Sequence, residues 1–107
     1  FLIMTNFATL KTNDTEYNLR LTARACINLE KDLGKNPISI FTGLKDGELP
    51  KISDIIAIIH ASIQTKHTIN ETYDIVDKYL EDNSMTDLIN LTLEVFKASG
   101  FIRNEKN

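Results

Sequence analysis

A single cysteine, no cluster of basic residues and no long apolar run set the first limits on this chain of 107 residues. Because Cys26 stands alone, it cannot form an intrachain disulfide, which favours a reducing, cytosolic location. The longest apolar stretch, residues 55–63, is interrupted by a histidine and a serine and is shorter than the roughly 20 residues that cross a bilayer. We therefore expect no membrane-spanning segment.

Lysine and arginine are spread thinly over a chain whose formal net charge is −3. Nucleic-acid binding through counterion release needs several clustered cations, so we expect no nucleic-acid partner. A helix-turn-helix interpretation fails for the same reason, because its recognition helix, residues 70–82, would carry five acidic residues against one lysine. Phosphates would repel this helix.

The first 21 residues contain two short runs of partly alternating character. Residues 7–10 and 16–21 flank a turn-forming cluster, and Tyr17, Leu19 and Leu21 fall on one face of the second run. This pattern predicts a β-hairpin. Because two strands alone are only marginally stable in water, the hairpin must pack on another part of the chain.

Capping residues mark the first two predicted helices. Thr22 is a good N-cap for a helix that Gly34 ends, and Ser53 is the predicted N-cap of a second helix over residues 54–65. Between them, residues 36–49 predict a loop with a short helical turn. The isoleucines of the second helix cover nearly its whole circumference, which is typical of a helix buried in the centre of a fold.

Two capping boxes predict the remaining helices. Thr68 with Glu71 opens a helix that runs to about residue 82, and Ser84 with Asp87 opens a helix that ends at residue 100. Phe101 is expected to fold back on the last helix, against Phe96. The apolar stripe expected for the third helix consists of Ile69, Tyr73, Val76 and Leu80, flanked by Ile75 and Tyr79.

The sequence thus predicts a mainly α fold, a small bundle of about four helices with an N-terminal β-hairpin. A single domain covers residues 1–107, as is usual for a chain of this length. The hairpin occupies residues 4–21, the helical bundle 22–102 and a polar tail 103–107. Residues 1–3 are interpreted as a scar or leader, with Met4 as a candidate initiator.

No residue pattern predicts catalysis, a metal or a cofactor. His60 and His67, two turns apart on one helix, would be separated by about 10.5 Å, too far for one zinc ion that binds nitrogen at ~2.0–2.1 Å. We expect His60 to be structural, with a hydrogen-bonded ring. Cys26 shares an apolar stripe with Leu29 and Leu33, so we expect a buried thiol rather than a nucleophile. An enzyme is not expected.

Four segments carry a family resemblance: LRLTARACINLEKDLGKNPISIF at residues 19–41, DIIAIIHASIQ, the capped YDIVDKYLED and a last helix ending in FKASGF. In these segments the chain, over residues 4–102, resembles the tail assembly chaperones of long-tailed (siphovirus-type) bacteriophages, prophages and gene transfer agents. The resemblance implies a small helical protein of the host bacterial cytoplasm, without enzymatic activity and absent from the mature virion. It also implies self-association and binding to the tape-measure protein, which is kept soluble while the tail tube protein assembles around it.

A chaperone for apolar helices needs an exposed surface that accepts them. The last helix is apolar over more than one packing stripe, and residues 38–44 carry further apolar side chains. The candidate partner-binding residues are Leu91, Val95, Phe96, Ile38, Phe41 and Leu44. The alternative is that both segments simply complete the core. Two other functions stay open: a structural tail component, such as a connector or completion protein, and a small cytosolic regulator that binds a protein.

Overall fold

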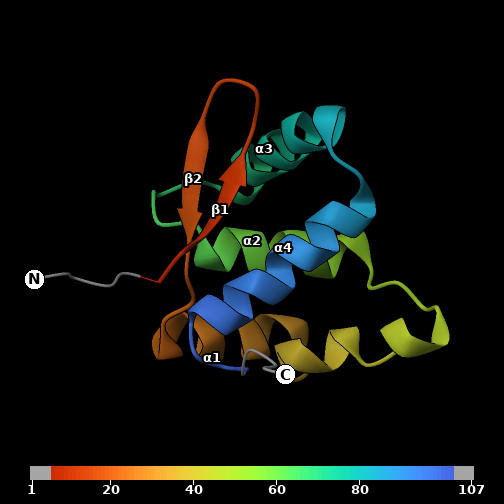
Figure 1. Cartoon of the computed structure of the whole chain (residues 1–107). Helices are drawn as coiled ribbons and strands as arrows, with labels where there is room; N and C mark the ends of the chain where they lie inside the picture. Colours follow the sequence, from red (N-terminus) through yellow and green to blue (C-terminus); the bar gives the residue numbers. More distant parts are fainter. Residues whose placement is uncertain (1–5, 103–107) are drawn as a thin grey trace, which may run out of the picture.

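The computed structural model describes residues 6–102 and shows a β-hairpin followed by a helical bundle (Figure 1). Within these residues the elements are β1 (Ala8–Lys11), β2 (Glu16–Leu19), α1 (Ala23–Leu33), the 3-10 helices η1 (Pro37–Phe41) and η2 (Leu44–Asp46), α2 (Ile52–Ser62), α3 (Ile69–Asp82) and α4 (Met85–Ala98). The predicted fold class, mainly α with an N-terminal hairpin, is confirmed. The predictions made for residues 1–3 and for the tail at 103–107 lie outside the described residues.

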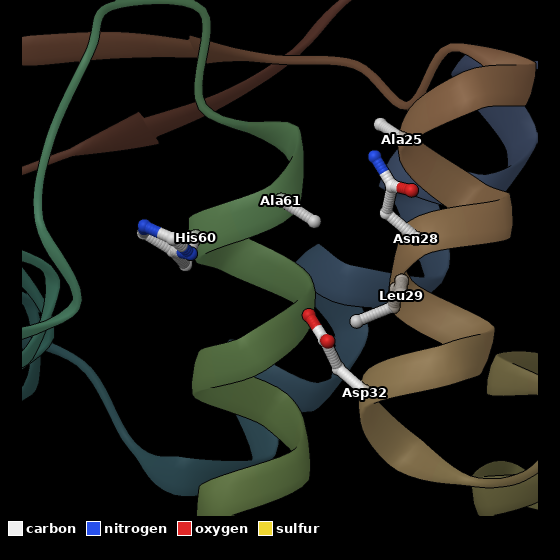
Figure 2. Close-up of a pocket in the computed structure, with 6 residues that line it drawn as sticks. All are labelled: Ala25, Asn28, Leu29, Asp32, His60 and Ala61. Atoms are coloured by element: carbon white, nitrogen blue, oxygen red, sulfur yellow. The ribbon is translucent and has the colours of Figure 1, made fainter.

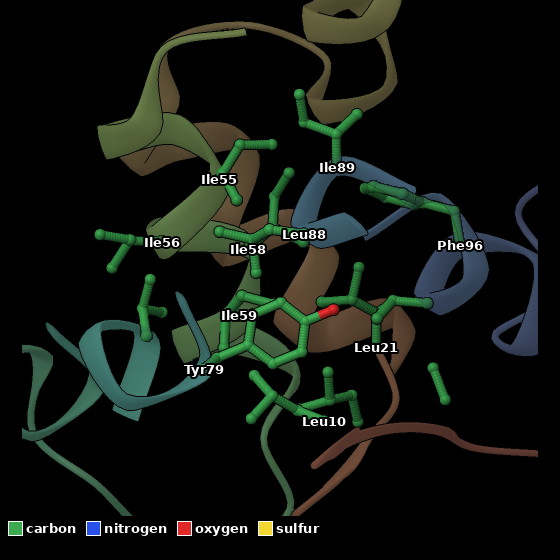
Figure 3. Close-up of a cluster of buried hydrophobic side chains, with 14 of the residues drawn as sticks. Leu10, Leu21, Ile55, Ile56, Ile58, Ile59, Tyr79, Leu88, Ile89 and Phe96 are labelled. Carbon is green, nitrogen blue, oxygen red and sulfur yellow. The ribbon is translucent and has the colours of Figure 1, made fainter. Parts of the chain in front are cut away.

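Helix α2 is the centre of the fold, as its sequence predicts. It contacts α1, α3 and α4, and its residues Ile55, Ile58 and Ile59 are completely buried. Figure 3 shows these isoleucines in one cluster with side chains from the hairpin, α3 and α4. Burial of each isoleucine stabilises the fold by roughly 1.5–3 kcal/mol. Because β-branched residues form helices weakly by themselves, α2 depends on this packing.

The predicted start of α2 is wrong. Ser53 is not the N-cap, because the helix begins at Ile52 and Ser53 lies within its first turn. The cap is Lys51, whose backbone is extended and whose side chain makes no capping hydrogen bond. Its carbonyl accepts hydrogen bonds from the N–H groups of Asp54 and Ile55, and these bonds fix the first turn without a hydroxyl.

The predicted end of α2 is also corrected, from residue 65 to Ser62. The next residue, Ile63, is extended and forms an isolated antiparallel bridge with Leu19 of β2. The N–H of Arg20 donates to the Ser62 carbonyl at 2.8 Å. Pairing with the hairpin therefore ends the helix. The same contacts connect the N-terminal hairpin to the middle of the chain.

The hairpin packs one face against the bundle. Strands β1 and β2 are antiparallel, with Ala8 opposite Leu19 and Leu10 opposite Tyr17. Leu10 and Leu19 are fully buried, Leu21 is 2% exposed, and β1 contacts α4. The predicted inward face of the second strand is confirmed, and the bundle supplies the support that two isolated strands lack.

The caps of the other helices form as predicted. The Thr22 hydroxyl accepts a hydrogen bond from the Ala25 N–H at 3.0 Å, and Gly34 ends α1 with φ of 73°. Complete capping boxes open α3 at Thr68 and α4 at Ser84. Each box satisfies two backbone donors at a helix start, so both helices begin at well-defined residues.

The buried face of α3 differs from the predicted stripe. The buried residues are Thr72, Ile75, Val76 and Tyr79, whereas Ile69 is 39% exposed and Tyr73 is 46% exposed. Thr72 can enter the core because its hydroxyl donates to the Thr68 carbonyl at 2.9 Å and stays satisfied there. The helix is therefore rotated relative to the prediction, and part of its apolar surface remains outside.

The end of α4 connects distant parts of the chain. The N–H of Phe101 donates to the Phe96 carbonyl at 2.9 Å after Gly100 turns with φ of 85°, and the two rings meet edge to face at 6.4 Å, as predicted. The Ser99 hydroxyl accepts a hydrogen bond from the Leu21 N–H at 2.8 Å. The C-terminal end of α4 is thereby fixed to the segment between β2 and α1.

Candidate functional site

The candidate partner-binding residues of α4 lie in or against the core. Val95 and Phe96 are completely buried, and Leu91 is half-buried and packs against the core cluster. A partner could reach Val95 or Phe96 only if the bundle opened. Val95 and Phe96 are therefore closed to a partner in this fold, whereas contact through Leu91 stays a prediction. Core packing explains much of the wide apolar character of α4.

Of the three candidates in the 3-10 helices, one is buried and two are half-buried. Phe41 is 8% exposed, and its ring meets that of Phe96 edge to face at 5.8 Å. Ile38 and Leu44 are half-buried against the core cluster. Phe96 thus lies between Phe41 and Phe101, and η1 covers the end of α4 instead of presenting a surface.

Large apolar side chains stay exposed elsewhere in the described residues, and two of them lie close together on α3; the exposed residues are Ile27, Leu49, Ile52, Ile69, Tyr73 and Phe101. We call Ile69, Tyr73 and Leu80 the α3 strip; their spacings of four and seven residues place them on one face of the helix. Ile69 and Tyr73 are among the large exposed apolar residues, and Leu80 is half-buried at the edge of the core. The sequence did contain a signal for this strip, because the apolar positions of α3 span a wider arc than one packing stripe needs.

An acidic ridge lies beside the α3 strip. We define it as Asp74, Asp77 and Glu81, which are all exposed and share one face through spacings of three and four residues. Asp77 is the helical neighbour of both Tyr73, four residues earlier, and Leu80, three residues later. No ion pair found within residues 6–102 engages the ridge.

The flank of α3 opposite the α3 strip faces the hairpin. The Lys78 ammonium donates to the Asp14 carboxylate at 3.0 Å, which lowers the pKa of Asp14 and raises the pKa of Lys78. This contact connects α3 to the turn between β1 and β2. The α3 strip lies on the other flank of the helix, away from the hairpin.

A small pocket lies between α1 and α2 (Figure 2). Its volume is about 230 Å³, and its lining residues are Ala25, Asn28, Leu29, Asp32, His60 and Ala61. Ligand sites usually enclose about 300–1,000 Å³, so this pocket is smaller than that class. The ring of His60 points away from α1, to the other side of α2. The polar side chains that remain at the pocket, Asn28 and Asp32, both come from α1.

The histidines and the cysteine have structural surroundings. Nε2 of His60 lies 2.9 Å from the His67 carbonyl, so this nitrogen donates and joins α2 to the loop before α3, as expected. The Cys26 thiol is half-buried rather than fully buried; burial, with a smaller effect of Glu30, raises its pKa. A raised pKa leaves less thiolate and opposes a role as nucleophile.

The described part of the chain gives no metal-binding cluster of three or more histidine, cysteine or acidic side chains. None of the helices between residues 6 and 102 combines the length and the apolar character that crossing a bilayer requires. The α3 strip with its acidic ridge is the surface in these residues where exposed apolar side chains and exposed carboxylates lie side by side.

Comparison with known proteins gives one family. A model described as "Family of unknown function (DUF6096)" matches residues 3–107, which is nearly the whole chain. No curated protein and no solved structure matches the chain.

Proposed function

We propose that the chain, which belongs to the DUF6096 family of unknown function, is a phage or prophage tail assembly chaperone. In this proposal it binds the tape-measure protein and keeps it soluble during tail assembly, by non-covalent shielding of apolar helices. It acts in the host bacterial cytoplasm and is absent from the mature virion. Self-association and a contact with the tail tube protein belong to the same proposal. The resemblance over residues 4–102 and the mainly helical fold support it.

The observation that carries this proposal is the exposed apolar surface of α3. A chaperone that acts by shielding needs apolar side chains that stay outside its own core and are held in place before the client arrives. Ile69 and Tyr73 meet both conditions, because the capping box at Thr68 fixes the helix start and Thr72 and Val76 anchor the adjacent face of the helix in the core. The client can then bind without refolding of the chaperone.

The direct test is co-expression with the tape-measure protein encoded nearby. We expect the wild-type chain to raise the soluble fraction of the client and to co-purify with it. The double variant Ile69→Ser/Tyr73→Ser should lose both effects and still fold, because neither side chain belongs to the core cluster. The matched control is Ile27→Ser on α1, where an isoleucine is 52% exposed away from α3.

Two results would refute the proposal. The first is an unchanged soluble fraction of the tape-measure protein together with no co-purification. The second is the presence of stoichiometric copies in purified virions, which would identify a structural tail component. Loss of client binding in Ile27→Ser as well as in the α3 double variant would remove the assignment to α3.

A further inference from the structure

We infer that the α3 strip and the acidic ridge form one seat for a single amphipathic helix whose apolar stripe is flanked by lysine or arginine. This inference rests on the proposed function and specifies the chemistry of the client segment. The seat combines Ile69, Tyr73 and Leu80 with Asp74, Asp77 and Glu81 (the α3 helix in Figure 1).

The dimensions of the seat fit one helix. Ile69 and Leu80 are 11 positions apart, which corresponds to about 16 Å along the axis, or three turns. A partner helix that lies along α3 would meet the strip with side chains spaced three or four residues apart. This is the common mode in which a helix presents an apolar stripe to a surface.

The charge of the ridge selects the occupant. The ridge carries three carboxylates, with no ion pair to another residue in the described range. A client with basic residues beside its apolar stripe gains attraction, whereas an acidic client is repelled. A second copy of the chain seated through α3 would bring two acidic ridges together, so the charge disfavours pairing of two copies through this face.

The position of the ridge sets the arrangement of charges that the client needs. Lys78 is held by Asp14 of the hairpin turn and lies on the flank of α3 opposite the strip. The ridge lies between the strip and Lys78 around the helix, and the other side of the strip is the buried face with Val76. The basic residues of the client must therefore lie on the side of its stripe that faces the hairpin. This asymmetry gives the seat a preference for one arrangement of charges along the client helix.

Two designed peptides test the inference directly. Both have about 20 residues, long enough to form a helix when bound, and both carry the same leucine stripe. One is flanked by lysines and the other by glutamates. Fluorescence anisotropy with labelled peptides is measured with the whole chain at low and high salt. We expect the lysine-flanked peptide to bind at least about tenfold more tightly at low salt, and this preference to shrink at high salt.

Matched variants separate the effect of the ridge on peptide affinity from the effect of the protein's net charge. Asp77→Asn/Glu81→Gln should weaken binding of the lysine-flanked peptide by about threefold to tenfold, as loss of two exposed ion pairs does. Glu30→Gln/Asp46→Asn changes the net charge equally at other exposed sites and should leave the affinity unchanged. Ile69→Ser/Tyr73→Ser should abolish binding of both peptides.

The outcomes also distinguish this inference from the proposed function. Equal affinity for the two peptides, or equal weakening by the two charge variants, would overturn the inference. Co-purification of the tape-measure protein without binding of either peptide would overturn the seat but leave the chaperone function standing. Selective peptide binding without any effect on the tape-measure protein would support the seat and refute the chaperone function. Self-association that is lost in Ile69→Ser/Tyr73→Ser would identify a second copy as the occupant and would overturn the inference.

Discussion

Truncation of Ile58 to alanine should destabilise the protein strongly, because this side chain lies at the centre of α2 and is completely buried. Alanine removes three carbon atoms and leaves a cavity that α1, α3 and α4 cannot fill without moving. Buried isoleucine-to-alanine changes lower the free energy of unfolding by about 2–5 kcal/mol. Small domains have a total stability of about 5–15 kcal/mol, so the loss is a large fraction of the whole.

Urea denaturation followed by circular dichroism measures this loss. With a slope of about 1–3 kcal/mol per molar urea, the midpoint should fall by at least about 0.7 M. Leu29→Ala, at 2% exposure on the facing side of α1, should behave in the same way. Ile27→Ala is the control, since a half-exposed isoleucine should change the stability by less than about 0.5 kcal/mol. Equal midpoints for Ile58→Ala and Ile27→Ala would refute the assignment of α2 as the central helix.

Three further predictions follow from individual contacts. Ser99→Ala should lower the free energy of unfolding by about 1–3 kcal/mol in urea denaturation, because the Leu21 N–H loses its partner; an unchanged midpoint would mean that water replaces the hydroxyl. Burial raises the pKa of Tyr79, so its contribution to the free energy of unfolding should be fully present below the ordinary pKa of about 10 and should be lost as the pH rises through the higher folded value. Tyr79→Phe should flatten this alkaline decline in stability. Identical pH profiles for the two proteins would show that Tyr79 does not cause it. Cys26 should react with iodoacetamide more slowly than a free thiol at neutral pH, and Glu30→Gln should increase the rate modestly; a rate above that of the free thiol would show that the thiolate is stabilised.

Features set by a few neighbouring residues could be predicted from the sequence. The caps at Thr22, Thr68 and Ser84 formed as expected, because each depends on a hydroxyl and a backbone N–H three residues later. The central position of α2 was also predictable, since a helix that is apolar on all sides has no other stable place in a small domain.

Features set by distant contacts could not be predicted. The end of α2 is decided by pairing between Ile63 and Leu19, which are far apart in the sequence. The rotation of α3 depends on which of its apolar residues find partners in α2, and Thr72 entered the core in place of Tyr73. Local pattern measures how much apolar surface a helix has, and tertiary packing decides which part of it remains outside.

The burial of three candidate partner-binding residues, Val95, Phe96 and Phe41, could not be predicted for a related reason. A surplus of apolar side chains on α4 is consistent with either a docking surface or a thick core, and the sequence alone does not distinguish the two. Phe96 is decisive, because rings from η1 and from the segment after α4 cover it on two sides. Once these aromatic contacts are formed, the apolar side chains of α4 pack within the domain, whereas Ile69 and Tyr73 of α3 stay exposed.

The hydrogen bond from Leu21 to Ser99 spans 78 positions of the chain and has a consequence for biosynthesis. A nascent polypeptide cannot make this contact until its ninety-ninth residue has left the ribosome. Until then the inner face of the hairpin, which α4 later covers, stays exposed to water and to other proteins. Almost the whole domain must therefore be synthesised before α4 can cover strands β1 and β2. The complete fold should then form late and in a single cooperative step.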